Sequence, residues 1–232
     1  RSLGTDTQTF TPPEDPQGNR RRVLQDLAIP EDAFVILYVG RFAEMKNLEQ
    51  LIAMMDHVEP VARPYYLVLA GDGEKREDVE KAALGRDNVF LRGYMDDQKE
   101  LVSLYAGADL FMNASTYETF GLVSLEAQAC GTSVIGVRGG GMDESLEGED
   151  PLILADSAAP QDLARAVDQA ARLEEYACPE AAEAIARRRR RRIERYFSLD
   201  ACFGRMTALY RHLRQGGRAV DFPAPEKPVQ RD

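Results

Sequence analysis

The sequence is short of long apolar runs, histidines and cysteines, and each shortage argues against a class of protein. None of its apolar runs approaches the roughly 20 residues that cross a bilayer, and nothing near Arg1 has the pattern of a signal peptide. Three cysteines, an odd number at wide spacing, argue against a disulfide framework and favour a reducing compartment, so we expect a cytoplasmic location. The two histidines, His57 and His212, lie far apart without a ligand pattern around them, so we expect no metal site.

Positively charged residues are outnumbered by negatively charged ones. With 29 Lys and Arg against 39 Asp and Glu, the net charge is −10, which argues against nucleic-acid binding by phosphate neutralisation. The exception is a run of six consecutive arginines, namely Arg187, Arg188, Arg189, Arg190, Arg191 and Arg192. One interpretation is a solvated helix whose surface charges pair with Glu180, Glu183 and Glu194. The alternative is a peripheral contact with an anionic membrane surface or with a further domain.

The 232 residues fit one domain, and a hydrophobic fraction of 44% with 29% charged residues is ordinary for a globular protein. The chain begins at Arg1 without a Met, so we expect an excised domain. Residues 1–19 are rich in Thr, Pro, Gly and Asp and are interpreted as the remnant of an interdomain connection. Residues 20–215 are predicted to form the domain, and residues 216–232, which contain three prolines, a mobile tail.

Apolar runs alternate with amphipathic segments through most of the chain. Continuous apolar runs such as residues 34–39 indicate buried strands of a parallel sheet. Strands are predicted at residues 34–39, 66–70, 89–92, 110–113, 133–137 and 151–154. Helices are predicted at residues 19–27, 46–58, 75–84, 97–105, 121–130, 160–173, 179–196 and 199–214. The pattern predicts an α/β fold with a doubly wound, mostly parallel Rossmann-like sheet and additional C-terminal helices.

Glycines and charged residues follow several of these strands. Gly40-Arg41, Gly71-Asp72-Gly73, Gly93-Tyr94 and residues 115–121 each come just after a predicted strand. Ligands of such sheets bind at the carboxyl ends of the strands, near the switch in strand order, so we expect these segments to line one cleft. The Gly71-Asp72-Gly73 segment is equally explained as a turn that needs small residues.

The stretch from Tyr117 onward carries the densest functional pattern. Glu118 and Glu126 are eight positions apart and flank a Phe120-Gly121 turn that opens a predicted helix. The helix rises about 5.4 Å per turn of 3.6 residues, so Glu118 would lie at its mouth and Glu126 about two turns along it. The N–H groups of Gly121, Leu122 and Val123 would lack intrahelical partners at the positive end of the helix dipole, where phosphate is favoured.

These residues resemble the Glu-x7-Glu signature of the retaining GT-B glycosyltransferases of family 4, also called group 1. The resemblance continues through Gly4-x-Asp6 with Phe10 and Pro12, Gly40-Arg41-Phe42 with Lys46-Asn47, Ala70-Gly71-Asp72-Gly73, Arg92-Gly93-Tyr94, Phe197-Ser198 and Tyr210. Enzymes of this family have two Rossmann-like domains. The chain resembles the second, C-terminal domain, which binds the nucleotide sugar, and the resemblance implies that the N-terminal acceptor domain is missing here.

The resemblance also implies roles for individual residues. Arg41 and Lys46 match the pair that holds the diphosphate, although an isolated Arg and Lys would ordinarily be surface residues. Glu126 matches the carboxylate that binds the ribose hydroxyls, and its ordinary alternative is an idle solvent-exposed acid. Glu118 matches the carboxylate that faces the transferred sugar, whereas it would otherwise merely complement the helix dipole. Together Glu118, Arg41 and Lys46 are the predicted catalytic residues.

The remaining predicted contacts come from loops. The resemblance implies that Thr119, Phe120 and Gly121, with Leu122 and Val123 behind them, present backbone amides to the sugar and phosphates. It places Gly40 beside the diphosphate and Gly93 with Tyr94 near the base.

The predicted function is therefore transfer of a sugar from a nucleoside diphosphate to an acceptor hydroxyl, as in a hexosyltransferase, with no cofactor besides that substrate. The isolated domain is expected to bind the donor without transferring it. Alternatives are a GT-B sugar-nucleotide epimerase or hydrolase, or a non-catalytic nucleotide-binding module. The base, the sugar and the acceptor stay undetermined by the sequence.

Overall fold

The computed structural model describes residues 4–60, 62–118, 121–139, 142–146, 148, 152–173 and 178–223. Its centre is a six-stranded sheet in the order β3-β2-β1-β4-β5-β6. All the strand pairs are parallel. The strands are β1 (Phe34–Val39), β2 (Tyr65–Ala70), β3 (Val89–Arg92), β4 (Leu110–Met112), β5 (Ser133–Val137) and β6 (Leu154–Ala155). The strand order reverses direction between β1 and β4, which confirms the predicted doubly wound α/β sheet.

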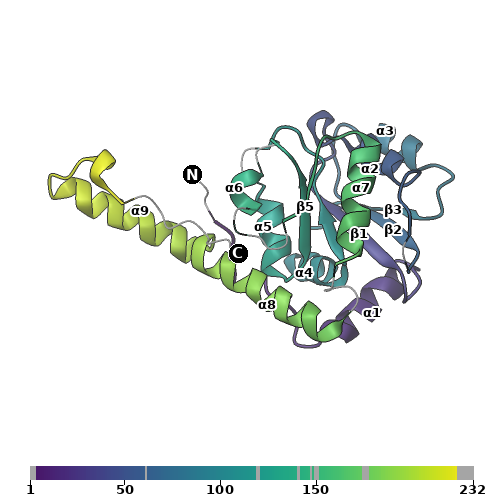
Figure 1. Cartoon of the computed structure of the whole chain (residues 1–232), viewed down its shortest axis with the longest axis horizontal. Coiled ribbons are helices and arrows are strands. Elements are labelled where there is room, and N and C mark those ends of the chain that lie inside the picture. Colours follow the sequence, from purple (N-terminus) through teal and green to yellow (C-terminus); the bar gives the residue numbers. More distant parts are fainter. Residues whose placement is uncertain are drawn as a thin grey trace.

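Helices cover both faces of the sheet (Figure 1). Their bounds are α1 (Pro16–Asp26), α2 (Leu48–Met54), α3 (Arg76–Ala83), α4 (Gln98–Gly107), α5 (Leu122–Ala129), α6 (Asp143–Leu146), α7 (Pro160–Ala171), α8 (Pro179–Tyr196) and α9 (Leu199–Arg214). Short 3-10 helices lie at η1 (Glu44–Lys46) and η3 (Ala219–Asp221). The last predicted strand, at residues 151–154, is shorter than expected: the structure begins it at Leu154, and Pro151 lies outside the described residues.

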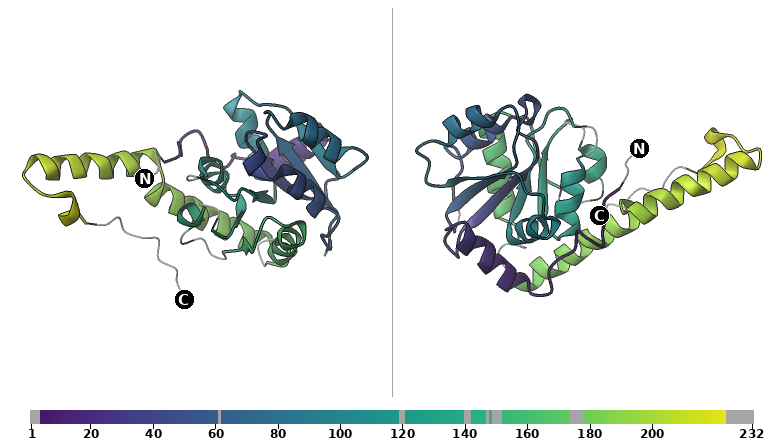
Figure 2. Two further views of the ribbon diagram at one scale, coloured as in Figure 1. Left: turned by 90° about the horizontal axis from the view of Figure 1, so that it is seen from above. Right: turned by 180° about the vertical axis from the view of Figure 1, so that it is seen from behind.

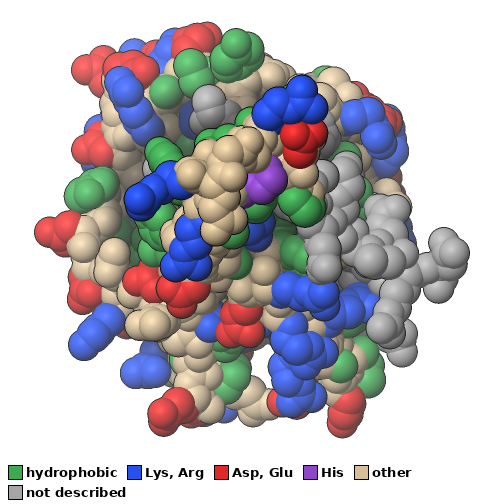
Figure 3. Space-filling view, turned by 90° about the vertical axis from the view of Figure 1, so that its left-hand side faces the viewer, with side chains coloured by type: hydrophobic (Ala, Val, Ile, Leu, Met, Phe, Trp, Pro, Cys, Tyr) green, Lys and Arg blue, Asp and Glu red, His purple; other side chains and the backbone are tan. Residues whose placement is uncertain are grey.

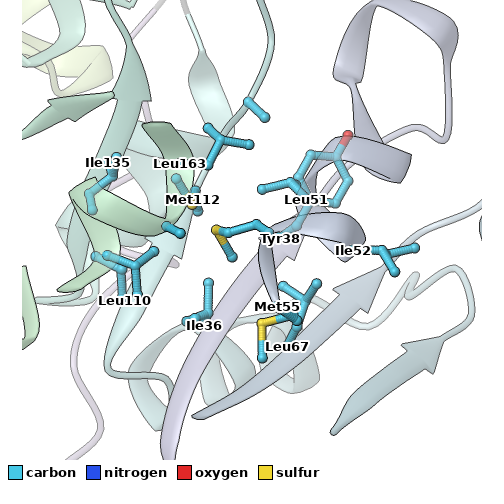
Figure 4. Close-up of a cluster of buried hydrophobic side chains, with 14 of the residues drawn as sticks. Ile36, Tyr38, Leu51, Ile52, Met55, Leu67, Leu110, Met112, Ile135 and Leu163 are labelled. Atoms are coloured by element: carbon cyan, nitrogen blue, oxygen red, sulfur yellow. The ribbon is translucent and has the colours of Figure 1, made fainter. Parts of the chain in front are cut away.

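The strand β1 explains the two layers, because successive side chains of a strand point to opposite faces. Phe34, Ile36 and Tyr38 pack into one core with side chains of α2, α3 and α7, part of which Figure 4 shows. Val35 and Leu37 pack into the other core with side chains of α1, α4, α5 and α8. Both faces of β1 are buried, as its unbroken apolar sequence predicted.

The helix predicted at residues 46–58 is interrupted near its start. Asn47 has a φ of 52°, in the left-handed region, and separates η1 from α2. Asparagine is among the few residues other than glycine that adopt this conformation with little strain. The break turns the segment containing Lys46 away from the axis of α2.

The N-terminal segment pairs with the junction between α8 and α9. The N–H of Thr5 donates to the carbonyl of Phe197 at 2.8 Å, and the N–H of Leu199 donates to the carbonyl of Thr5 at 3.0 Å. Gly4 has a φ of +69°, and a Cβ atom there would lie 2.8 Å from the carbonyl oxygens of Phe197 and Ser198. Two segments far apart in the sequence are therefore adjacent in the fold. The division of the chain into connection, domain and tail stays a prediction.

Beyond this junction α9 extends away from the layered domain (Figures 1 and 2). Apolar residues recur along it at alternating steps of four and three, the spacing of a helix–helix seam, at Leu199, Phe203, Met206, Tyr210 and Leu213. The last four of these side chains are exposed. This spacing gives α9 an apolar stripe that the described residues leave largely uncovered.

The arginine run divides between the inside and the outside of α8. The predicted surface pairs are present at Arg187 with Glu183, 2.5 Å apart, and at Arg190 with Glu194, 2.7 Å apart. Glu180 instead accepts a hydrogen bond from the Cys178 thiol. Seen from the end of α9, the surface carries basic side chains interspersed with acidic and hydrophobic ones (Figure 3).

Six consecutive arginines surround a helix, so some of them must face the fold, and the structure shows which ones do. Arg189 donates to the carbonyl of Gly131 at 2.9 Å, and Arg192 donates to the carbonyl of Ser145 at 2.9 Å; both arginines are buried. Arg190 donates to the carbonyl of Ala129 at 2.9 Å as well as to the N-terminal segment. These three arginines bind α8 to the end of α5 and to α6, so they are not available to a membrane.

Candidate functional site

The loops after β1 and β4 meet at the switch in strand order and bring two predicted residues into contact. The Nζ atom of Lys46 lies 2.5 Å from the Oε2 atom of Glu118, and both side chains are largely buried, with 18% and 14% exposed. Asn113, at the end of β4, also donates to Oε2 of Glu118 at 3.4 Å. A cation and a carboxylate are thus held together at the edge of the sheet where ligands of this fold bind.

Two further hydrogen bonds join the same two loops, and a third lies within the loop after β4. The side chain of Asn47 donates to the carbonyl of Ala114 at 2.8 Å. The Ser115 hydroxyl lies 3.1 Å from the carbonyl of Met45, and Asn113 Oδ1 accepts from the N–H of Ser115 at 3.0 Å. Sequence reasoning named Asn47 only as part of the family resemblance and Ser115 only as part of a segment expected to line the cleft, and it did not single out Asn113. What pointed to these contacts was position, since small polar residues that follow a buried strand are frequent hydrogen-bonding turn formers.

Tyr38 makes a hydrogen bond to the loop that follows β1. It is 1% exposed at the end of β1, and its hydroxyl donates to the carbonyl of Arg41 at 2.9 Å. Burial raises the pKa of Tyr38, and the negative charge of Glu118 raises it further. The phenol therefore stays protonated and acts as a fixed hydrogen-bond donor.

Arg41 lies beside the loop that follows β2. Its guanidinium contacts the carboxylate of Glu74 at 2.9 Å, and both side chains are exposed. A hydrogen bond from its own backbone N–H, and then the contact with Arg41, hold the pKa of Glu74 below its ordinary value. The structure does not place Arg41 in contact with Lys46 or Glu118.

Glycines allow the loop after β2 to approach the loop after β1 closely. Gly71 has a φ of +149°, and a Cβ atom there would lie 1.9 Å from the carbonyl oxygen of Gly40. A Cβ atom on Gly73 would lie 2.3 Å from the carbonyl oxygen of Phe42. Between the two glycines, the carbonyl of Asp72 accepts from the N–H of Phe42 at 2.8 Å. The Gly71-Asp72-Gly73 segment is therefore explained by close backbone packing.

The helix α5 begins next to Glu118. Gly121 has a φ of +70° at its N-cap, and its carbonyl accepts a hydrogen bond from the N–H of Ser124 at 2.9 Å. The N–H groups of Leu122 and Val123 lie in the first turn, where amides have no intrahelical acceptor. Thr119 and Phe120, also predicted to contact the ligand, lie outside the described residues.

Glu126 lies further along α5 and is half-buried. Its Oε2 atom accepts a hydrogen bond from the hydroxyl of Tyr105 at 3.0 Å. Burial raises the pKa of Glu126 above its ordinary value, although the Tyr105 hydroxyl acts to lower it. The structure therefore shows a carboxylate whose ionisation depends on a neighbouring phenol, and sequence reasoning did not foresee Tyr105 in this place.

The other predicted loop residues are spread along the edge of the sheet. Gly40 follows β1 and donates its N–H to the carbonyl of Ala70 at 3.0 Å. Gly93 and Tyr94 follow β3, which β2 separates from β1, and the Tyr94 side chain is exposed. Two hollows of about 240 and 510 Å³ lie between α1 and α4 and beside α2 and α7; none of the predicted site residues lines either one.

The described residues contain neither a cluster of potential metal ligands nor a helix that could span a membrane. Within residues 4–223, apart from the gaps given above, no cluster of three or more His, Cys, Asp or Glu could hold a metal ion. In the same part of the chain, no helix combines the length and the apolar character that a membrane span requires.

Comparison with known proteins points to one family. The sequence profile described as "Glycosyl transferases group 1" matches residues 19–192. A D-inositol 3-phosphate glycosyltransferase of Saccharomonospora viridis is 31% identical over 181 residues, which cover 73% of this chain and 41% of that protein. The chain thus spans about two fifths of this relative.

Solved structures show the same arrangement. Sucrose-phosphate synthase from Thermosynechococcus elongatus superposes with a TM-score of 0.71 at 30% identity, covering 92% of this chain and 52% of that one. The C-terminal domain of a group 1 glycosyl transferase from Francisella tularensis superposes with a TM-score of 0.64 at 24% identity, covering 84% of this chain and 99% of that domain. The second likeness concerns the fold alone.

Proposed function

The chain belongs to the group 1 glycosyl transferases, and from that membership we propose that it is the donor-binding half of a retaining enzyme. This enzyme would transfer a hexose from a nucleoside diphosphate to an acceptor hydroxyl. The observation that carries the proposal is the contact of Lys46 with Glu118 at 2.5 Å, at the switch between β1 and β4. It joins a phosphate-binding cation to a carboxylate suited to sugar hydroxyls.

The diphosphate occupies the space between the first loop and the start of α5. Lys46 and Arg41 neutralise it, and charge-assisted hydrogen bonds of this kind are stronger than neutral ones. The first-turn amides of α5, at Gly121, Leu122 and Val123, complete the anion site together with Thr119 and Phe120. Because these groups supply the positive charge, binding needs no metal.

Glu126 binds the ribose and Glu118 orients the sugar. A carboxylate accepts hydrogen bonds from both hydroxyls of a vicinal diol. The acceptor hydroxyl attacks the anomeric carbon from the face on which the diphosphate leaves, and the leaving phosphate takes its proton. Glu118 then acts by position and charge, and the cations stabilise the charge that grows on the leaving phosphate. Gly40 lies against the diphosphate, and Gly93 and Tyr94 lie near the base.

The acceptor is held by a second domain. This proposal is supported by the partial coverage of the relatives and by the apolar stripe of α9, which is exposed in the described part of the chain. Packing that domain against the stripe would bury its four exposed side chains. Positioning two reactants contributes roughly 7 to 11 kcal/mol to lowering a barrier, so this domain alone is expected to transfer sugar very slowly.

A cytoplasmic location, peripheral at the membrane, is part of the same proposal. The few, widely spaced cysteines support a reducing compartment. The membrane contact rests on the outward arginines of α8, since Arg189 and Arg192 are buried. Exposed Arg187, Arg188 and Arg191 remain on its outer face. We expect the chain to sediment with anionic vesicles and charge reversal of these three arginines to abolish that sedimentation.

A thermal-shift panel of UDP, GDP and ADP tests the donor role. A ligand at 100 times its dissociation constant stabilises a protein by about 2.7 kcal/mol, which is readily measured. We expect one diphosphate to raise the melting temperature, and product from the matching sugar nucleotide only when the acceptor domain is attached. Transfer by this chain alone at the rate of the two-domain enzyme would contradict the assignment.

A further inference from the structure

Tyr105 is a buried titratable group whose hydroxyl is aimed at the candidate site. It lies on α4 with no exposed surface, and its ring meets those of Phe10 and Phe111 edge-on, with centroids 6.2 and 5.8 Å away. Its backbone carbonyl accepts from the Thr132 hydroxyl at 2.7 Å. The ring is therefore held on several sides, and the hydroxyl reaches Oε2 of Glu126 at 3.0 Å.

We propose that Tyr105 is a positioning residue that holds Glu126 in the orientation and the ionised state in which it binds ribose. The inference rests on the proposed role of Glu126 in ribose binding. Tyr105 itself touches no substrate. It fills one of the two acceptor positions of Oε2 of Glu126, while Oε1 has no protein partner among the described residues.

Tyr105 and Glu126 each depend on the hydrogen bond between them. A phenol hydroxyl buried without a partner carries a desolvation penalty, so the ring position of Tyr105 requires an acceptor there. A half-buried carboxylate is biased toward its neutral form, and a donated hydrogen bond favours the charged form. Burial raises the pKa of Glu126, and the hydrogen bond from Tyr105 acts in the opposite direction and lowers it.

The titratable groups around Glu126 keep their charge state when the pH falls below neutral. Burial raises the pKa of the Cys130 thiol, at the end of the same helix, to about 12. Burial likewise raises the pKa of Tyr105 itself and of Tyr38 on β1. From α8, Arg190 faces this region, and an arginine keeps its charge throughout. Among the described residues around it, Glu126 is then the group whose charge is lost as the pH falls.

The substitution Tyr105→Phe tests the inference because it keeps the ring and deletes only the hydroxyl. The probe is whichever of UDP, GDP and ADP gives the largest thermal shift, titrated beside its 2′,3′-dideoxy analogue, which has the same phosphates. We expect about tenfold weaker binding of the ribonucleotide and unchanged binding of the analogue, as for loss of a hydrogen bond to a charged group.

The pH profile separates positioning from a merely structural role. Without the donor, the pKa of Glu126 rises, so its charge is lost at a higher pH. The loss of ribonucleotide affinity should therefore grow as the pH falls, and the dideoxy analogue corrects for titration of the phosphates. Tyr66→Phe is the matched control, since it deletes a hydroxyl from β2 on the same face of the sheet.

Glu126→Gln distinguishes the failure of this inference from the failure of the proposed function. If Glu126→Gln leaves the preference for ribose unchanged, the ribose role itself is wrong. If Glu126→Gln removes that preference and Tyr105→Phe binds like the wild type at every pH, the positioning role alone is overturned.

Should Tyr105→Phe not fold, incorporation of 3-fluorotyrosine provides a second test. The fluorinated phenol is a stronger donor, so the pKa of Glu126, followed by NMR of its carboxyl carbon, should fall. An unchanged pKa would overturn the inference.

Discussion

Lys46 and Glu118, which are separated along the chain by α2, β2, α3, β3, α4 and β4, form a largely buried ion pair at 2.5 Å. Neither residue lies in a strand or a regular α-helix: Lys46 ends η1, and Glu118 precedes the N-cap of α5. Their contact is made by loops that β1 and β4 bring together at the switch in strand order. Hydrogen bonds from Asn47 and Ser115 hold those loops in place.

Removing one member of this pair should destabilise the fold. Lys46→Met leaves the charge of Glu118 less compensated in a largely buried place, so we expect a cost of about 1 to 3 kcal/mol in the free energy of unfolding. Adding Glu118→Gln should recover part of that cost. Urea unfolding measures both, with Lys81→Met on the exposed face of α3 as the control. A Lys46→Met variant no less stable than the control would contradict the account.

Nucleotide binding should survive chelation. Lys46 and Arg41 supply the positive charge, so EDTA should leave the affinity for the nucleoside diphosphate unchanged. Lys46→Ala and Arg41→Ala should each weaken binding of the nucleoside diphosphate much more than binding of the free nucleoside. Loss of binding in EDTA and its recovery with magnesium would show that a metal performs this task.

Glu74 should compete with the diphosphate for Arg41. The pair is exposed, and such pairs contribute little, so Glu74→Gln should strengthen diphosphate binding by only about two- to fivefold. Repeating the substitution in the Arg41→Ala background isolates the mechanism, because Glu74 then has no cation to release. An equal gain in both backgrounds would mean that Glu74 acts through its general negative charge. Calorimetry at low ionic strength measures all four proteins.

Gly71→Ala should damage the site through the backbone. The added Cβ atom would overlap the carbonyl of Gly40, so the loops after β1 and β2 must separate. We expect a loss of about 1 to 3 kcal/mol in stability, as for overpacking of a core, together with weaker diphosphate binding. Gly204→Ala in α9 is the control: a Cβ atom there would meet no atom within 4 Å, and alanine favours a helix. Equal stability of the two variants would refute the close-packing explanation.

The sheet was predictable because its strands are nearly continuous apolar runs. Phe34 through Val39 carry no charged residue, and an apolar run of this length is typical of a strand buried on both faces. The helix boundaries were less predictable where one residue decides them. Asn47 ends the first turn before α2 because it adopts a left-handed conformation, which its side-chain bond to Ala114 supports.

The site was predictable as a set of loops but not as a set of contacts. Glu118 and Glu126 share one sequence motif, whereas their partners Lys46 and Tyr105 come from other β-α units. The inward orientation of Arg189, Arg190 and Arg192 depends likewise on carbonyls at the end of α5 and in α6. Charge pattern alone favours solvation, because no local rule indicates which face of α8 meets unpaired carbonyls.

Calorimetric titration of UDP, GDP and ADP into this chain and its Glu126→Ala variant tests the central claim most directly. The account predicts that at least one diphosphate binds the wild type. It predicts that Glu126→Ala binds that nucleotide more weakly by about 1.5 to 3 kcal/mol, the range for losing hydrogen bonds to a charged acceptor, with an unchanged circular dichroism spectrum. Absence of binding by all three diphosphates, or equal affinity of the folded variant, would contradict the assignment of a donor site to α5 and its neighbouring loops.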